Sequence, residues 1–192
     1  MKKFLAFTLI FFCTISNINA EEIKRIFVGN KDAKITIIAF ESLTCSHCAN
    51  FHKDVYPELK KNYLDTGLAK IEFRHFPLDI AAFNASKVAQ CNNDGDSKIL
   101  NTLFANQQKW VKGSSAAEAN ENLKKFLTSE GFNIDFEACI NDKKIEDFVL
   151  NDRIDGVKKF KVNATPTIII NDKKFEKTLN FKNLKKAIEK LI

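Results

Sequence analysis

The sequence predicts an α/β fold into which a helical domain is inserted. Strand-type runs at residues 35–40 and 69–76 flank a helical pattern, and an apolar hairpin with a final helical pattern ends the chain. Residues 79–142, between these parts, show helical periodicity only. We therefore expect a discontinuous α/β domain, residues 21–78 and 143–192, and a helical insertion domain at 79–142.

The first twenty residues are typical of a secretory signal peptide. Lys2 and Lys3 give a basic start, residues 4–15 are apolar, and the small residue Ala20 suits signal peptidase, so cleavage is expected after Ala20. The apolar run is too short to span a bilayer. Cys13 is expected to be removed with this segment, and the remaining chain is expected to be exported.

The charge pattern excludes one class of partner. The formal net charge is +6, but the basic residues are scattered among Asp and Glu along the chain. A nucleic-acid-binding domain concentrates its basic residues on one face or stripe. Nucleic-acid binding therefore has no support.

A pair of cysteines in C-x-x-C spacing follows the first core strand, with Cys45 where a helix should begin. The first turn of a helix has unpaired N–H groups and the positive end of the macrodipole, which favour a thiolate at Cys45. Cys48, one turn later, is placed to close a disulfide onto Cys45. The spacing therefore indicates a redox-active pair.

Three other roles for this pair stay open at the level of the sequence. A zinc site needs four ligands, and no second C-x-x-C or H-x3-H follows, so no metal is expected. The pair could also form an inert structural disulfide or two buried free thiols, although a turn and helix start favour exposure.

Four cysteines remain after signal-peptide removal, and an exported protein retains its disulfides. Three pairings of four cysteines are possible. The close pair Cys45 and Cys48 leaves Cys91 with Cys139 as a second, structural bridge. That bridge would clamp the two ends of the helical insertion.

The first half of the α/β domain begins with a short edge strand within residues 23–28, before the core strand at 35–40. The helix that starts at the dithiol has a core face with helical spacing, formed by Phe51, Val55 and Leu59. Pro57 is expected to break or kink that helix near Tyr56. Pro77 ends the strand at 69–76.

The insertion is expected to hold four helices, starting at Asp79, at Asp96 or Ser97, at Ser115 and near Phe136. Ser115 and Glu118 have the spacing of a capping box, and Gly131 is the expected stop of that helix. The second of these helices is expected to run on to Trp110.

The last part of the chain predicts a helix at 144–160 whose apolar residues are Ile145, Phe148, Val149 and Val157. Pro166 precedes an apolar strand at 168–170, and a turn leads to a second strand at 174–177. The final helical pattern is amphipathic, with apolar positions at Phe181, Leu184, Ile188 and Leu191.

This order of elements is that of a thioredoxin fold with an inserted helical domain. The chain resembles the DsbA-type periplasmic thiol:disulfide oxidoreductases of bacteria across nearly the whole mature sequence. Two segments carry the resemblance: Ser42-Leu43-Thr44-Cys45-Ser46-His47-Cys48, and the run from Gly156 and Val157 to Thr165-Pro166-Thr167.

The resemblance implies that Cys45 and Cys48 are catalytic, and that His47 helps to stabilise the Cys45 thiolate. It also implies a substrate-binding segment in which Pro166 is a cis-proline that faces the dithiol and Thr165 offers backbone groups to a peptide. Ser46 would border the substrate. The chain departs from the family at Ser46, where proline is commoner.

The resemblance leaves one family role unassigned. Ala39 lies where many members have a buried acid that assists proton transfer to the inner cysteine. Glu41 is nearby, but strand alternation is expected to turn it to the other face. His52 and His75 are expected to be structural.

The function that the resemblance implies is the introduction of disulfide bonds into exported proteins by dithiol-disulfide exchange in the periplasm. Expected partners are reduced exported proteins and a DsbB-like membrane quinone reductase, with a monomeric protein and no organic cofactor. Two alternatives stay open: an isomerase or reductase, which usually has a dimerisation domain, and a non-catalytic peptide-binding module with structural disulfides.

Overall fold

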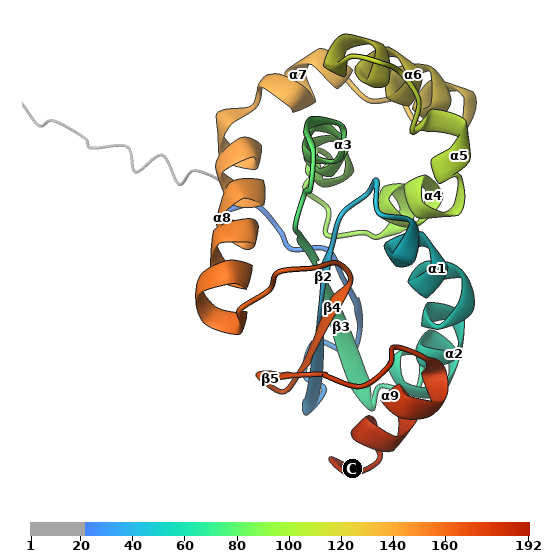
Figure 1. The fold of residues 1–192 in the computed structure, drawn as a ribbon, viewed down its shortest axis with the longest axis vertical. Helices are drawn as coiled ribbons and strands as arrows, with labels where there is room; N and C mark the ends of the chain where they lie inside the picture. Colours follow the sequence, from blue (N-terminus) through green and yellow to red (C-terminus); the bar gives the residue numbers. More distant parts are fainter. Residues whose placement is uncertain (1–21) are drawn as a thin grey trace, which may run out of the picture.

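A five-stranded mixed sheet forms the centre of the protein (Figure 1). The structure, a computed structural model, describes residues 22–192, so the expected signal peptide lies outside the described residues. The sheet has the order β1-β3-β2-β4-β5. Its strands are β1 (Phe27–Gly29), β2 (Ile35–Glu41), β3 (Ala69–His75), β4 (Thr167–Ile170) and β5 (Lys173–Lys174).

The central strand β2 is buried on both faces, which explains its continuous apolar sequence. It pairs parallel with β3 and antiparallel with β4. Ile35, Ile37 and Ala39 join the main hydrophobic cluster, whereas Ile38 and Phe40 join a smaller cluster on the opposite face. The predicted α/β fold class is confirmed, with edge strands shorter than expected.

Helices cover both faces of this sheet. Figure 1 shows α8 (Lys143–Phe160) on one side and α1 (Ser46–Asp54), α2 (Tyr56–Leu59) and α9 (Phe181–Ile188) on the other. The chain between α1 and α2 breaks at Val55, and Pro57 lies in the first turn of α2, where its missing N–H costs nothing. A π-helical turn, η1 (Lys60–Leu64), follows. The predicted break is confirmed.

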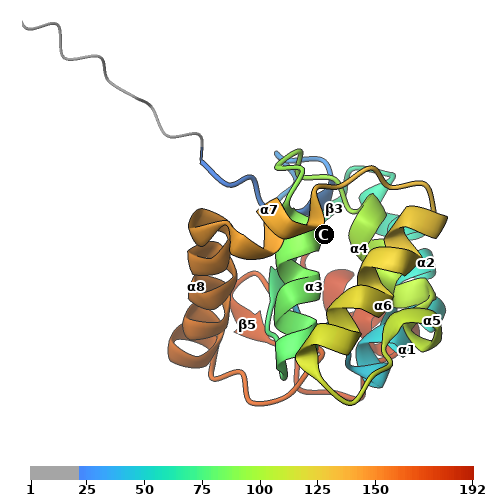
Figure 2. The same cartoon turned by 90° about the horizontal axis from the view of Figure 1, so that it is seen from above.

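Between β3 and α8 the structure contains helices only. These are α3 (Ile80–Gln90), α4 (Lys98–Ala105), α5 (Gln107–Trp110), α6 (Ala116–Ser129) and α7 (Phe136–Asn141). Seen from above, α3 lies between α8 on one side and α4 and α6 on the other (Figure 2). The helix expected to continue to Trp110 is interrupted at Asn106, which caps α4 and precedes α5.

The caps of these helices follow the sequence closely. Asp79 accepts a hydrogen bond from Ala82 N at 2.7 Å, and Ser115 accepts one from Glu118 N at 3.2 Å. The reciprocal half of the predicted capping box is displaced, because the Glu118 carboxylate accepts from the N–H of Ser114 rather than from that of Ser115. The helix α6 is capped all the same.

The insertion is tied to the rest of the fold in two ways. The expected disulfide joins Cys91, which follows α3, to Cys139 in α7. The main hydrophobic cluster also runs without interruption from the sheet into the insertion, through Phe73, Leu103, Phe104, Trp110 and Leu127. The boundaries proposed for the insertion therefore separate regions that share one core.

The helix α8 buries Ile145 and Val149 as expected, but it differs from the expected pattern at two positions. Val157, one of the apolar residues of the predicted helix, is 47% exposed, whereas Asp152 is 2% exposed. The reason is the close approach at Gly156, where an added Cβ would lie 2.9 Å from the Phe40 ring. This approach turns Ile145, Val149 and Asp152 toward the sheet, and Asp152 accepts hydrogen bonds from Arg25 and from His75 N.

The C-terminal hairpin is shorter than predicted. The strand expected at 174–177 is reduced to Lys173–Lys174, and Leu191 lies beyond the end of α9 and is exposed. Within residues 22–192, no helix is long and apolar enough to cross a membrane.

Candidate active site

The cysteine pair lies at the start of α1, as the strand-turn-helix pattern predicts. Cys45 is the N-cap residue of α1, and its carbonyl accepts hydrogen bonds from Cys48 N and Ala49 N. Both cysteines are free thiols; Cys45 is half-buried and Cys48 is fully buried. One sulfur is therefore reachable by a substrate and the other is not.

The surroundings shift the pKa values of the two cysteines in opposite directions. The pKa of Cys45 is lowered to about 5, chiefly by a hydrogen bond from the Cys48 thiol, and further by the Thr165 side chain and the backbone N–H groups of Cys48 and His47. Burial raises the pKa of Cys48 far above its ordinary value, and the Glu41 charge adds to that rise. At neutral pH the pair is a thiolate at Cys45 beside a thiol at Cys48.

The segment Thr165-Pro166 faces this pair. Its peptide bond is cis, and the Cys45 Sγ lies 3.4 Å from the Thr165 carbonyl oxygen. A cavity of about 420 Å³ runs along this side of α1, lined by residues that include His47, Asn50, Thr165, Pro166 and Phe181. The structure thus brings together Cys45, Cys48, His47, Thr165 and Pro166 from the sequence prediction.

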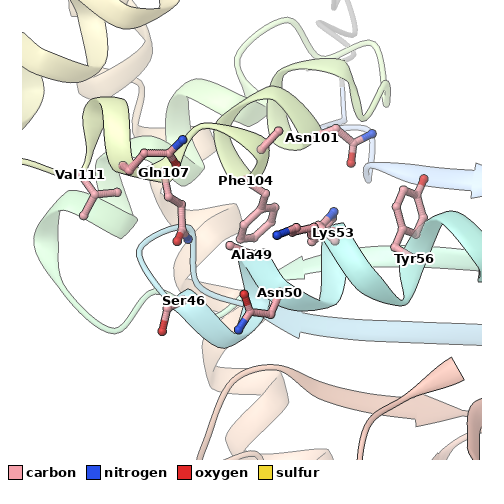
Figure 3. Close-up of a pocket in the computed structure, with 12 residues that line it drawn as sticks. Ser46, Ala49, Asn50, Lys53, Tyr56, Asn101, Phe104, Gln107 and Val111 are labelled. Atoms are coloured by element: carbon pink, nitrogen blue, oxygen red, sulfur yellow. The ribbon is translucent and has the colours of Figure 1, made fainter.

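A second and larger cavity, of about 900 Å³, lies between α1 and helices α4 and α5 (Figure 3). Ser46 lines this cavity rather than the one at Pro166, so it lies apart from the other predicted binding residues. Asn50 lines both cavities.

Two polar contacts hold the turn before α1, and neither was predicted from the sequence. Gln107 Nε2 donates to the carbonyl oxygens of Leu43 and Cys45 at 2.7 and 3.0 Å. Thr44 Oγ1 donates to Asp79 Oδ2 at 2.6 Å, so the N-cap of α3 also fixes the dithiol turn. These partners lie 35 or more residues away in the chain, and no local pattern marks them.

The expected orientation of Glu41 is wrong. Residues two apart in a strand share a face, so Glu41 lies on the face of Ala39, inside the protein, and is 4% exposed. Its Oε2 is hydrogen-bonded to His52 Nε2 at 2.9 Å. Burial raises the pKa of Glu41, against the lowering effect of His52. A buried acid is therefore present near the dithiol, two residues from the position where the family usually has it.

The two buried imidazole groups, those of His52 and His75, differ in their neighbours. The His52 ring stacks on Phe104 at 4.1 Å between ring centroids. His75 Nε2 lies 3.3 Å from Gln90 Oε1, and burial lowers the pKa of His75. His75 thus belongs to the contacts between β3 and α3, and it is the partner of Glu41 in the pairing of β2 with β3.

The thiolate at Cys45 gives a direct prediction. Because its pKa is lowered to about 5, the rate of iodoacetamide alkylation of the reduced protein should rise with a midpoint near pH 5. The measurement is the alkylation rate of Cys45, followed by mass, between about pH 3 and 9. A midpoint near the ordinary value of about 8.5 would contradict the stabilisation.

Because the pKa of Glu41 is raised in the folded protein, this residue lowers the free energy of unfolding at pH values above its ordinary pKa of 4.5. A carboxyl with a raised pKa in the folded state stabilises the fold only below the unfolded value, and that stability is lost as the pH rises. Replacement Glu41→Gln should therefore increase the free energy of unfolding at pH 7 and leave it little changed near pH 4. Urea titrations of both proteins at both pH values test this. The prediction is wrong if the replacement does not increase the free energy of unfolding more at pH 7 than at pH 4.

The fold and the site define a thioredoxin-fold protein with an inserted helical domain, a C-x-x-C pair at a helix start and a cis-proline beside it. Residues 21–190 match the thioredoxin family, and the chain belongs to this family, among its DsbA-like members.

Solved and curated relatives agree with this assignment. The crystal structure of Wolbachia pipientis alpha-DsbA1 is similar at 30% identity and a TM-score of 0.76, over 87% of this chain and 90% of that one. Disulfide bond formation protein D of Bacillus subtilis is 27% identical over 175 residues, covering 85% of this chain and 75% of that protein.

Rickettsial relatives are longer than this chain. A candidate protein-disulfide oxidoreductase of Rickettsia bellii is 29% identical over 169 residues, covering 86% of this chain. The match covers 63% of the R. bellii protein. The chain thus spans about three fifths of the length of this relative.

Proposed function

We propose that the protein is a thiol:disulfide oxidoreductase that introduces disulfide bonds into exported proteins. The observation that carries the proposal is the asymmetric pair facing the cis-proline, with a stabilised thiolate at Cys45 and a buried thiol at Cys48. A stabilised thiolate favours the reduced form of the pair, which makes the oxidised form a good acceptor of electrons.

The reaction starts from the oxidised pair. A substrate thiolate attacks Cys45 Sγ, the Cys45–Cys48 bond breaks, and the Cys48 sulfur leaves and takes up a proton. A second substrate thiolate then attacks the substrate sulfur of the mixed disulfide and releases Cys45 as a thiolate. The substrate gains one disulfide and the enzyme holds two electrons. The low pKa of Cys45 makes it the better leaving group in this second step.

The cavity along Pro166 is the proposed place for the substrate chain beside its cysteine. The backbone of Thr165 lies next to Cys45, and Phe181 adds an apolar surface to the cavity. His47 also borders this cavity and is exposed. An extended peptide can therefore pair with the cis-proline segment while its sulfur meets Cys45.

The setting of this activity is part of the proposal. Residues 1–20 would direct export, with cleavage after Ala20, and the protein would act in the periplasm as a monomer. Reduced exported proteins would be its substrates, and a DsbB-like membrane quinone reductase would reoxidise it. The dithiol itself carries the electrons, so no metal or organic cofactor is needed for the exchange.

The reduction potential of the pair tests the proposal. The mature protein is equilibrated in glutathione buffers, and free thiols are trapped with a maleimide of known mass. A reduction potential of about −120 mV, typical of DsbA proteins, supports a dithiol oxidant. A potential of about −270 mV, typical of thioredoxin, indicates a reductase. A pair that shows no exchange would instead be structural or part of a metal site.

The side chain of His47 gives a narrower prediction. Its backbone N–H already contributes to the low pKa of Cys45, and a charged imidazole nearby would add to that effect. Replacement His47→Ser should therefore raise the pKa of Cys45 and lower the reduction potential, as measured by thiolate absorbance and glutathione titration. An unchanged thiolate titration would remove the side chain from the mechanism and leave the backbone N–H as its only contribution.

A further inference from the structure

Glu41 and His52 have buried side chains that are hydrogen-bonded to each other near the dithiol. Glu41 and His52 have side chains that are 3% and 6% exposed, and the Oε2 of the first lies 2.9 Å from the Nε2 of the second. Each has one remaining polar atom that is buried without a hydrogen-bond partner, Oε1 of Glu41 and Nδ1 of His52. A buried polar atom without a partner is costly, so this arrangement calls for a reason other than stability.

The two ends of the pair have different surroundings. Glu41 acts electrostatically on both sulfurs of the dithiol. His52 lines the 900 Å³ cavity between α1 and helices α4 and α5, whose other lining residues Figure 3 shows. Pro166 and Thr165 line the smaller cavity and not this one, and Asn50 borders both.

The proposed reaction requires a proton at a place that solvent does not reach. Cys48 is 0% exposed, and its sulfur must take up a proton when it leaves the disulfide and lose it again when the pair is reoxidised. Glu41 is the buried acid near it, but a carboxyl that gives up its proton must be resupplied before the next cycle. The side chain hydrogen-bonded to Glu41 is His52.

We infer that His52 passes protons between Glu41 and the solvent of the cavity at α4 and α5, so that protons and substrate reach the dithiol through two different cavities. This inference rests on the proposed function. Glu41 gives its proton to the Cys48 sulfur, the His52 Nε2–H replaces it, and the buried Nδ1 takes up a proton when water from the adjoining cavity reaches it. On reoxidation the proton returns by the same atoms, and no further reactant is needed.

The groups that face His52 are compatible with this path. Tyr56, whose ring centroid lies 5.3 Å from that of His52, stays neutral because burial raises its pKa to about 12. Lys53 of α1 lines the same cavity, and the lining residues from α4 and α5 are uncharged: Asn101, Phe104, Ala105, Gln107 and Gln108. His52 contacts Glu41 and also lines the cavity, so its imidazole lies between the acid and the cavity. It acts through Glu41 and is a positioning residue in this sense.

The experiment compares His52→Gln with the matched control His75→Gln. A glutamine can keep a hydrogen bond to Glu41 but cannot carry a proton through a ring. His75 is the other buried histidine and bonds to Gln90 instead. The rate measured is the multiple-turnover oxidation of a reduced two-cysteine peptide by glutathione disulfide, from about pH 5 to 8.

We expect His52→Gln to slow turnover about a hundredfold and to change its pH profile, while His75→Gln keeps the wild-type profile. In the His52→Ala variant, added imidazole should enter the large cavity and raise the turnover rate at least about tenfold over the rate without imidazole. Circular dichroism verifies that each variant is folded.

The turnover of the wild-type protein distinguishes a failure of the proposed function from a failure of the proton relay alone. If the wild-type protein does not oxidise the peptide, the proposed function fails and the relay with it. If the wild type is active and His52→Gln matches it in rate and pH profile, the relay alone is wrong. A slow, folded His52→Ala variant that imidazole does not restore would make His52 a packing residue and overturn the inference.

Discussion

Replacement of Cys45 by serine is expected to abolish peptide oxidation, with a loss of about a thousandfold or more in rate. The Cys45 sulfur is the disulfide atom attacked in the oxidised pair, and it leaves as a thiolate in the second step. A serine hydroxyl forms no disulfide and ionises far above neutral pH, whereas the pKa of Cys45 is lowered to about 5. The measurement is the disappearance of peptide thiols under glutathione disulfide.

Cys48→Ser is the matched control for this experiment. The serine hydroxyl keeps a donor at the place from which the Cys48 thiol stabilises the Cys45 sulfur, so the thiolate should persist. With a one-cysteine peptide under glutathione disulfide, this variant should accumulate a mixed disulfide, detectable by mass, because neither Cys48 nor a second peptide thiol is there to resolve it. Full activity of Cys45→Ser would instead support the alternative of a peptide-binding module whose cysteines are only structural.

The features that the sequence predicted best are local ones. The position of Cys45 at the helix start, the break at Pro57 and the cap at Asp79 each depend on a few neighbouring residues. The pairing of Cys91 with Cys139 followed from counting cysteines in an exported chain. In each case the physical cause lies within one turn or one simple pairing rule.

The features that were missed depend on contacts across the fold. Gln107 reaches the carbonyls of the dithiol turn from 62 or 64 positions away, and its sequence context is an ordinary polar helix. Asp152 was not expected in the core, because its partners Arg25 and His75 N come together only when α8 packs on the sheet. Such satisfied buried charges carry no periodic signal.

Glu41 is a different kind of error. Strand alternation does contain the information, since Ala39 and Glu41 are two residues apart and share a face. A carboxylate at the end of a buried strand looks like a surface residue until its partner is known. That partner, His52, is on the next helix, and their hydrogen bond fixes the acid inside the protein.

Removal of the Cys91–Cys139 bridge is expected to lower the free energy of unfolding by about 2–4 kcal/mol. The bridge closes a loop with a sequence separation of 48 residues, and this loop contains α4, α5 and α6. Opening it gives the unfolded chain more conformations, while the folded contacts stay nearly unchanged. The comparison is made by urea unfolding of Cys91→Ala/Cys139→Ala in a background of Cys45→Ser and Cys48→Ser, so that the dithiol does not contribute.

The parent with the bridge intact and then chemically reduced is the control, and reduction should cost about as much as the double replacement. The hydrophobic cluster runs from Phe73 in the sheet to Leu127 in the insertion, so both proteins should unfold in one transition. The Gln107 contacts to the dithiol turn should then be lost together with the sheet rather than before it. Two separate transitions, or an unchanged free energy of unfolding, would show that the insertion is stabilised independently and that the bridge does not clamp it.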